Sequence, residues 1–150
     1  MKKETDPRMH SAEHILNQTM VRMFNCNRSF NAHIEKKKSK CDYHLDHALT
    51  EQEIDRIEKQ VNAVIEADLP IAEEYLTKEE ARQQYNVKRL PRDTGDDIRI
   101  VGIGDYDACP CIGSHVASTK EIGTFRIISA SFFETGVLRI RFKLGQPESP

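Results

Sequence analysis

The sequence predicts an α+β fold in two layers, in which helices pack against a mainly antiparallel sheet. Helical and strand patterns are intermixed along the 150 residues, and no repeat or linker divides them. The last two strand patterns, at 124–131 and 137–144, are joined by a tight turn near Glu134-Thr135-Gly136. Such a turn joins antiparallel neighbours, because parallel strands need a long crossover. The length suits one compact domain, so we expect a single domain over residues 1–150.

Two longer helices are predicted from their capping residues and apolar spacing. Asp6-Pro7 supplies a capping side chain and a first-turn proline for the first helix. Its apolar residues recur at steps of three and four, at Met9, Ala12, Leu16, Met20 and Met23. Thr50-Glu51-Gln52-Glu53 is a capping box. It opens a long helix with an apolar side formed by Ile54, Ile57, Val61, Val64 and Ile65.

Strand patterns occupy much of the remaining chain. The segments 30–35 and 41–45 flank a lysine-rich turn and are typical of a hairpin. Residues 70–75 are a short strand candidate, and residues 98–103 are apolar and strand-like. A second capping box, Thr77-Lys78-Glu79-Glu80, predicts a short helix after the first of them. Residues 137–142 alternate apolar and charged side chains, which indicates a half-buried strand.

Composition excludes several classes of protein. The formal net charge is −2, so bulk charge cannot drive tight, unspecific binding to nucleic acid. The first fifty residues, with 9 basic and 6 acidic side chains, are the more favourable part for a polyanion. No apolar run approaches the roughly 18 residues of a membrane span. The four cysteines are too scattered for a disulfide scaffold. We therefore expect a cytoplasmic protein with no membrane segment, whose cysteines serve metal binding or reactivity.

Two short motifs pair metal-ligating side chains. His10 and His14 lie four residues apart, which on a helix places both imidazoles on one face. Cys111 and His115 have the same spacing far along the chain, so only the fold can bring the two pairs together. A thiolate with three imidazoles would be a ligand set typical of zinc. Glu13 precedes the second histidine instead of following the first, which disfavours the HExxH pattern of metalloproteases.

Longer stretches resemble the editing domain of alanyl-tRNA synthetases. Residues 105–127, DYDACPCIGSHVASTKEIGTFRI, are similar to that family's CGGTHV and TGEIG signature. Residues 10–16, HSAEHIL, resemble its HSAxHLL motif. Three further segments resemble the family in the same order. They are residues 41–43 with the later stretch LTEQEIDRIEKQVNAVIEADLPI, residues 97–101, and residues 135–140. The resemblance covers a core of about residues 8–144. The same domain occurs in freestanding trans-editing proteins of the AlaX type, and a related one in threonyl-tRNA synthetases.

This resemblance implies an activity, a metal and a substrate. The family hydrolyses the ester that joins a wrong amino acid to the 3′ end of a tRNA, so we expect an aminoacyl-tRNA deacylase, a carboxylic ester hydrolase. One zinc ion per chain is implied, with ligands at His10, His14, Cys111 and His115. The motif GSHV at residues 113–116 resembles the alanine type and differs from RGPHV of the threonine type. This resemblance favours Ser-tRNA(Ala) as substrate, with Gly-tRNA(Ala) as a second substrate. The chain has no room for an aminoacylation domain, so we expect the short freestanding type, acting in trans on released mischarged tRNA.

The chemistry of the zinc ion is left open by the residues. Four protein ligands would close its tetrahedron, so we expect His10, His14 and Cys111 to be firm ligands and His115 to be fourth or displaceable. The free position would hold a water that the metal activates or the α-amino group of the substrate, and no further catalytic residue is predicted. If all four ligands stay bound, the zinc organises the pocket only, and a positioned water and the ribose hydroxyl of the tRNA carry the chemistry. Three alternatives stay open: a Ser-tRNA(Thr) deacylase, a zinc hydrolase of another ester or amide, and a non-catalytic zinc-stabilised RNA-binding module. The oligomeric state is open as well.

Further residues are candidates for contacts with the substrate. A pocket that selects a hydroxyl needs polar groups, and Asn31 and His33 are the candidates, with an outward-facing strand position as the alternative. The lysine-rich turn predicts contact with RNA phosphates through Lys36, Lys37, Lys38 and Lys40. Further basic residues are expected to extend this RNA-contact surface. They are Arg28, and Arg139, Arg141 and Lys143 on the last strand.

The cysteine motif departs from the family pattern at two positions. Ile112 stands where the family usually has glycine, and Ser114 where it usually has threonine. A side chain at 112 is expected to narrow the pocket or to shift the backbone. Cys109 also lies two residues before Cys111. Cys109 could compete as a ligand, but we prefer Cys111, because it has a histidine four residues later, and we expect Cys109 to lie next to the ligand set or to be a small buried residue.

Overall fold

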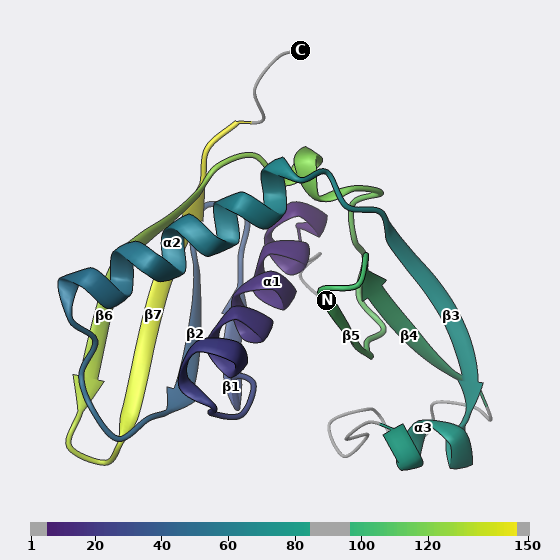
Figure 1. Ribbon diagram of the computed structural model, residues 1–150, viewed down its shortest axis with the longest axis horizontal. Helices are drawn as coiled ribbons and strands as arrows, with labels where there is room; N and C mark the ends of the chain where they lie inside the picture. Colours follow the sequence, from purple (N-terminus) through teal and green to yellow (C-terminus); the bar gives the residue numbers. More distant parts are fainter. Residues whose placement is uncertain (1–5, 85–96, 147–150) are drawn as a thin grey trace.

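The computed structural model describes residues 6–84 and 97–146, which form helices and two antiparallel sheets (Figure 1). The elements in chain order are α1 (Pro7–Phe24), β1 (Asn31–Ile34), β2 (Ser39–His44), α2 (Glu51–Glu66), β3 (Ile71–Thr77), α3 (Lys78–Gln84), β4 (Asp97–Ile103), β5 (Asp107–Pro110), the 3₁₀ helix η1 (Thr119–Ile122), β6 (Phe125–Phe133) and β7 (Val137–Leu144). One sheet has the strand order β1-β2-β7-β6 and the other β3-β4-β5. The predicted α+β class with antiparallel pairing is confirmed.

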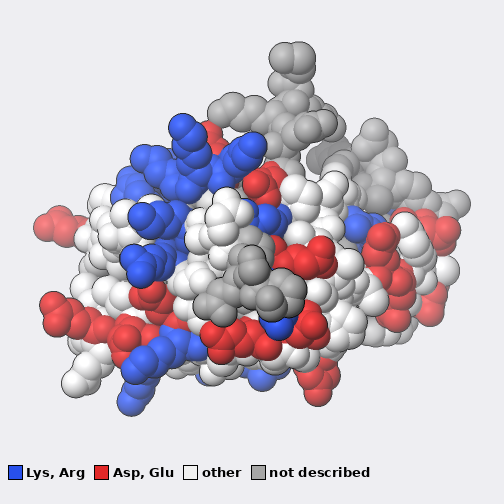
Figure 2. Space-filling model, turned by 90° about the horizontal axis from the view of Figure 1, so that it is seen from above, with Lys and Arg blue, Asp and Glu red and all other residues white. Residues whose placement is uncertain are grey.

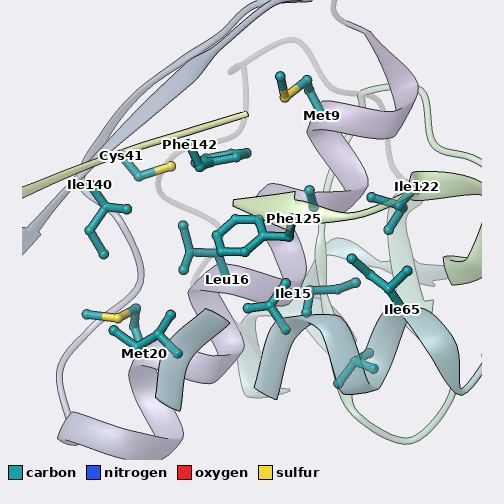
Figure 3. Packing of buried hydrophobic residues seen from close by; sticks show 14 of the residues in the cluster. Met9, Ile15, Leu16, Met20, Cys41, Ile65, Ile122, Phe125, Ile140 and Phe142 are labelled. Atoms are coloured by element: carbon teal, nitrogen blue, oxygen red, sulfur yellow. The ribbon is translucent and has the colours of Figure 1, made fainter. Parts of the chain in front are cut away.

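The four-stranded sheet carries the main hydrophobic core. Helices α1 and α2 cover the same face of this sheet (Figure 1). The residues of β7 that point toward the helices are fully buried, namely Leu138, Ile140 and Phe142. Arg139 and Arg141, between them, belong to the opposite face. Phe125 of β6 and Leu16 of α1 lie together near the middle of this core (Figure 3).

The three-stranded sheet has a much smaller core. Its buried cluster consists of Ala81 from α3 with Ile98 and Ile100 from β4, and half-buried Leu76 packs against them. Helix α1 lies between the two sheets and contacts β1 on one side and β5 on the other (Figure 1). The N-terminal helix is therefore the element that both halves of the molecule share.

The capping signals of the sequence are confirmed. The Asp6 side chain accepts a backbone N–H at the start of α1, at 2.8 Å. Thr50 and Glu53 form a reciprocal capping box on α2, and Thr77 and Glu80 make the same pair of bonds before α3. Each bond joins residues two or three positions apart, which is why a local pattern predicts it. Within the described ranges, no helix has the length and apolar character that a membrane crossing requires.

Strand β5 and the 3₁₀ helix η1 are regular elements that the sequence pattern did not predict, and β5 is the one that bears on the site. Its four residues show no alternation of apolar and polar side chains, and they end in a proline. The strand forms through backbone pairing with β4 at the edge of the three-stranded sheet, where a proline is tolerated. Because β5 directly precedes Cys111, this strand decides where that cysteine lies.

Candidate metal centre

Helix α1 presents two imidazoles on one face. His10 and His14 lie one turn apart, and their ring centroids are 5.0 Å apart. His10 is half-buried and His14 is buried. The helix is anchored in the main core by a set of buried apolar residues, which includes Met9, Ala12, Ile15, Leu16 and Met20. The anchoring holds both rings at a defined place between the two sheets.

The other two donors come from the irregular segment between β5 and η1. The backbone N–H of Cys111 donates to the carbonyl of Arg99 at 3.1 Å. The Arg99 guanidinium donates in return to the carbonyl of Gly113 at 2.6 Å. Farther along, the N–H of Ile71 donates to the carbonyl of Ala117 at 2.9 Å. These bonds tie both ends of the segment to the three-stranded sheet and turn its middle toward α1.

The four predicted ligands meet in space. His10, His14, Cys111 and His115 each offer one ligating atom, and these atoms all lie within 4.8 Å of one another. The Cys111 Sγ is 3.4 Å from Nε2 of His10 and 3.5 Å from Nε2 of His115. The His115 ring centroid lies 4.3 Å from that of His10 and 4.5 Å from that of His14. The fold therefore joins the two sequence motifs into one group that could hold a metal ion.

Two of the imidazoles are oriented by partners at Nδ1. The Nδ1 of His10 lies 3.2 Å from the carbonyl oxygen of Ser114, which can only accept a hydrogen bond. The Nδ1 of His115 lies 3.0 Å from Oγ of Ser11, a buried residue of α1. With these partners on Nδ1, both Nε2 atoms are left to face the Cys111 sulfur. This is how metal-binding histidines are commonly oriented.

The electrostatics of the cluster favour a thiolate. Burial alone would raise the pKa of the Cys111 thiol, but hydrogen bonds from His10, His115 and His14 lower this pKa to about 3. Burial is the main cause that lowers the pKa of His115, and the two neighbouring imidazoles lower it further. Thiolate and neutral imidazole are the forms that bind a metal. The donor set therefore fits Zn²⁺, which prefers sulfur and nitrogen ligands in a tetrahedral arrangement.

Gly113 allows the segment to approach α1 closely. A β-carbon at this position would overlap the imidazole ring of His10, so a larger residue would displace the ring or the backbone. The neighbouring Ile112 is 61% exposed. The structure thus turns the unusual isoleucine outward, and the glycine that the close approach requires is present at 113.

A buried carboxylate lies behind the third imidazole. Asp107 accepts hydrogen bonds from Arg28 at 2.7 Å and from Gln18 at 3.0 Å. The Nδ1 of His14 lies 3.6 Å from Oδ2 of Asp107 and 3.2 Å from Sγ of Cys109. Burial would raise the pKa of Asp107, but His14 and Arg28 hold it below its ordinary value. Burial would lower the pKa of His14, but contacts with Asp107 and with the two cysteines raise it.

Sequence reasoning missed Asp107 and placed Cys109 beside the ligand set. The structure puts the Cys109 sulfur against the back of the His14 ring, outside the group of four, and with His14 and Asp107 it forms a second group whose ligating atoms lie within 4.8 Å of one another. The available signal was the spacing Asp107-x-Cys109-x-Cys111, because alternate residues of an extended chain point to the same side. The signal went unused because β5 itself was not predicted.

Glu13 brings a second carboxylate to the cluster. Its Oε1 lies 3.7 Å from Nε2 of His10, and its side chain is 15% exposed. The spacing of three residues from His10 on a helix is the signal that puts both on one face. Glu13 was expected only to distinguish the sequence from a metalloprotease motif, and its place beside His10 was not predicted.

The two predicted pocket residues lie elsewhere. In the β1–β2 register, Asn31 is opposite Asp42 and His33 is opposite Lys40. Both Asn31 and His33 are exposed. Cys41, between Asp42 and Lys40, is buried in the core beneath α1. Because successive side chains of a strand alternate between faces, Asn31 and His33 point away from α1, and the structure does not bring them to the cluster.

The predicted RNA-contact residues lie at a basic hollow on that outer face. The hollow has a volume of about 300 Å³ and is lined by His33, Glu35, Lys38, Ser39, Lys40 and Arg141. Lys36 and Lys37 are exposed in the adjoining turn. Figure 2 shows that Lys and Arg side chains gather on one side of the molecule. Lys40 pairs in register with Arg141, so two strands contribute charge to the same surface.

Comparison with known proteins connects this arrangement to one family. Residues 98–141 match the family described as "Threonyl and Alanyl tRNA synthetase second additional domain". The matched segment includes Cys111 and His115 and extends from β4 into β7.

The chain is also similar to part of several alanine–tRNA ligases. It is 33% identical to the ligase of Fervidobacterium nodosum over 141 residues, and this alignment covers 93% of the chain and 16% of the ligase. It is 31% identical over 140 residues to the ligase of Coxiella burnetii, with 93% and 16% covered. For the ligase of Bacillus subtilis the identity is 30% over 138 residues, with 91% and 16% covered. The chain thus spans about one sixth of the length of these curated relatives.

Proposed function

Because this chain belongs to the family of editing domains of the alanyl-tRNA synthetase type, we propose that it is a zinc-dependent deacylase of mischarged tRNA(Ala). In the proposed reaction, water adds to the carbonyl of the aminoacyl ester. The bond to the ribose oxygen breaks, and a free amino acid and an uncharged tRNA leave. The preferred substrate is Ser-tRNA(Ala), followed by Gly-tRNA(Ala), and the reaction takes place in the cytoplasm with residues 1–150 acting as one domain.

The observation that carries this proposal is the convergence of His10, His14, Cys111 and His115 within 4.8 Å. These residues would hold one zinc ion, with His10, His14 and Cys111 as firm ligands. An open position requires that one of four ligands yield, and His115 is the ligand that we assign to this. When bound, the metal supplies a Lewis acid for the ester carbonyl or lowers the pKa of a water molecule.

Glu13 is the side chain that we propose to accept the proton of the attacking water. Its position 3.7 Å from Nε2 of His10 supports this, because the carboxylate borders the cluster without being one of its four donors. The proton would pass from Oε of Glu13 to the ribose oxygen as the ester bond breaks. Glu13→Gln keeps the size of the side chain and removes the base, so kcat should fall about 10²–10⁴-fold.

Zinc content is the control for this variant, since a lost metal would also abolish activity. Glu134→Gln, in the exposed turn between β6 and β7, makes the same chemical change away from the site and should keep the wild-type kcat. An unchanged kcat in Glu13→Gln at full zinc occupancy would exclude Glu13 as the proton acceptor.

The tRNA would contact the basic hollow on the outer face of the four-stranded sheet. We assign its phosphate contacts to Lys36, Lys37, Lys38 and Lys40, which lie in or beside the β1–β2 turn. Strand β1 is the edge of that sheet, and α1 packs on its other face. The single-stranded 3′ end of the tRNA would therefore reach the cluster by passing around the edge strand β1.

The proposed function is tested by offering charged tRNAs in solution to the purified protein. Ser-tRNA(Ala) should be hydrolysed fastest, Gly-tRNA(Ala) more slowly, and Ala-tRNA(Ala) should be spared. A chelator, or the change Cys111→Ala, should abolish hydrolysis. Cys26→Ala should not, because Cys26 is a half-buried cysteine that is not among the four donors.

Three other outcomes would contradict the proposal. Faster hydrolysis of Ser-tRNA(Thr) would indicate a threonine-type substrate. Turnover of small esters without tRNA would indicate a general zinc hydrolase. Loss of folding on chelation with no deacylation by the intact protein would indicate a non-catalytic, zinc-stabilised RNA-binding module.

A further inference from the structure

His14 differs from the other histidines of the cluster in what lies behind its ring. His10 faces a backbone carbonyl and His115 faces a hydroxyl. Behind His14, at Nδ1, lie the carboxylate of Asp107 and the sulfur of Cys109. The side chains of His14 and Asp107 are 4% and 0% exposed, so water does not compete for this contact.

Asp107 is held in one orientation by two donors. Arg28 donates to Oδ1 at 2.7 Å and to Oδ2 at 3.3 Å, which makes a bidentate ion pair. Gln18 donates to Oδ1 at 3.0 Å. Because Gln18 follows His14 by one turn of α1, the carboxylate is fixed along the helix face that carries the cluster. Oδ1 is occupied by both donors, and Oδ2 is the oxygen near the His14 ring.

The charge of this carboxylate determines which ring nitrogen carries the proton. A neutral imidazole has one N–H and one lone pair, and the hydrogen bond at one nitrogen sets the state of the other. A lone pair on Nδ1 would face the negative Asp107, whereas an N–H there is attracted by it. The favourable tautomer leaves the lone pair on Nε2, the nitrogen directed away from Asp107.

We infer that Asp107, fixed by Arg28 and Gln18, is a positioning residue that keeps the His14 proton on Nδ1 and presents Nε2 to the metal ion. The inference rests on the proposed zinc site. Cys109 lies closer to Nδ1, but sulfur is a weak hydrogen-bond acceptor. Its contribution to the orientation is therefore the smaller of the two.

The affinity for zinc tests this assignment without any tRNA. Competition with a chromophoric chelator measures the affinity of wild-type protein and of Asp107→Asn, each shown to be folded by circular dichroism. Loss of such a ligand-orienting group is expected to weaken zinc binding about 10–100-fold. Cys109→Ala should weaken it less, and a larger loss for Cys109→Ala than for Asp107→Asn would overturn the assignment.

Asp42→Asn is the matched control. Asp42 accepts two hydrogen bonds from Arg139, at 2.8 Å and 3.1 Å, in the four-stranded sheet. The variant therefore removes a carboxylate from a similar bidentate pair that does not touch the cluster. Its zinc affinity should equal that of the wild type. If Asp107→Asn also binds zinc like the wild type, Asp107 does not position His14.

A second measurement needs no variant. Long-range ¹H–¹⁵N correlation spectra of the zinc-bound wild type identify the protonated nitrogen of each imidazole. The expected result for His14 is a proton on Nδ1 and the metal on Nε2, and the reverse would overturn the inference while leaving the zinc site in place. A wild-type protein that binds no zinc would instead overturn the proposed metal site, and this inference with it.

Discussion

The two sheets of this protein are stabilised in different ways. Most of a cluster of 18 buried apolar residues comes from the four-stranded sheet, α1 and α2. Among the described residues, the separate cluster on the three-stranded sheet has three, Ala81, Ile98 and Ile100. Since burial stabilises by about 25 cal/mol per Å² of apolar surface, most of the free energy of unfolding belongs to the four-stranded half.

Polar contacts at α1 help to attach the three-stranded half. The Arg28–Asp107 ion pair links the chain after α1 to β5, and the two motifs of the candidate metal centre meet across the same junction. Ile103 and Tyr106 add apolar contacts, because they belong to the main core. A metal ion would therefore add to the polar and apolar contacts that join the two halves.

Removal of the metal should produce the largest difference in stability between the two sheets. Structural zinc contributes roughly 10–16 kcal/mol of apparent binding free energy in small zinc-finger peptides. Its loss should therefore destabilise the three-stranded half, which contributes Cys111 and His115 to the site. We expect zinc-free protein and Cys111→Ala to lose amide hydrogen-exchange protection in β4 and β5 by orders of magnitude. Protection in β2 and β7 should stay near the zinc-bound level, because both strands are packed in the main apolar core. Equal loss in both sheets would show that the molecule unfolds as one unit.

Core truncations should show the same asymmetry at a smaller scale. Phe125→Ala opens a cavity in the main core and should lower the free energy of unfolding by about 3–5 kcal/mol. Ile98→Ala, in the small cluster, should cost about 2 kcal/mol, the low end for such a change, because few neighbours lose contacts. Urea denaturation of zinc-loaded protein measures both. A cost for Ile98→Ala that matches Phe125→Ala would contradict the division into a strong and a weak half.

The parts of this fold that a sequence predicts are those that depend on near neighbours. Asp6, Thr50 and Thr77 cap helices through bonds to residues two or three positions away, so the pattern alone predicts the helix starts. The pairs His10–His14 and Cys111–His115 are likewise local spacings. Their meeting is not local, and it was predicted only through the resemblance to a family.

Features set by strand register could not be predicted in the same way. Asn31 and His33 face outward because β1 pairs with β2 in one register, and a shift by one residue would reverse both. Asp107 was missed because β5 exists only through pairing with β4. Backbone pairing across distant segments leaves little trace in the residues themselves, so polar groups placed by such pairing need the structure to be found.

Acid should weaken the four-stranded sheet through Asp42. Hydrogen bonds from Arg139 hold the pKa of this buried carboxyl below its ordinary value, against the effect of burial. A lowered pKa contributes stability that is fully present above the unfolded value near 4 and is lost as the pH falls through the folded value. Asp42→Asn should therefore lower the free energy of unfolding by about 1–2 kcal/mol at pH 6.

Below about pH 4 the difference between Asp42→Asn and the wild type should shrink, because the carboxyl of the unfolded wild type is protonated there first and that of the folded protein only as the pH falls further. Urea denaturation of both proteins between pH 3 and 7 measures this trend. A difference that stays constant across that range would show that the amide disturbs packing and that the charge of Asp42 contributes nothing.

The smallest expected effect concerns the outer face of the same sheet. Lys40→Ala and Arg141→Ala each remove one charge from the basic hollow, so each should reduce the slope of log affinity against log salt for tRNA by about 1. The loss should be equal for serine- and glycine-charged tRNA, because phosphates carry no information about the amino acid. Lys59→Ala, on α2 beyond the opposite face, should leave the slope unchanged. A change in kcat without a change in slope would instead connect this face to the chemistry at the cluster.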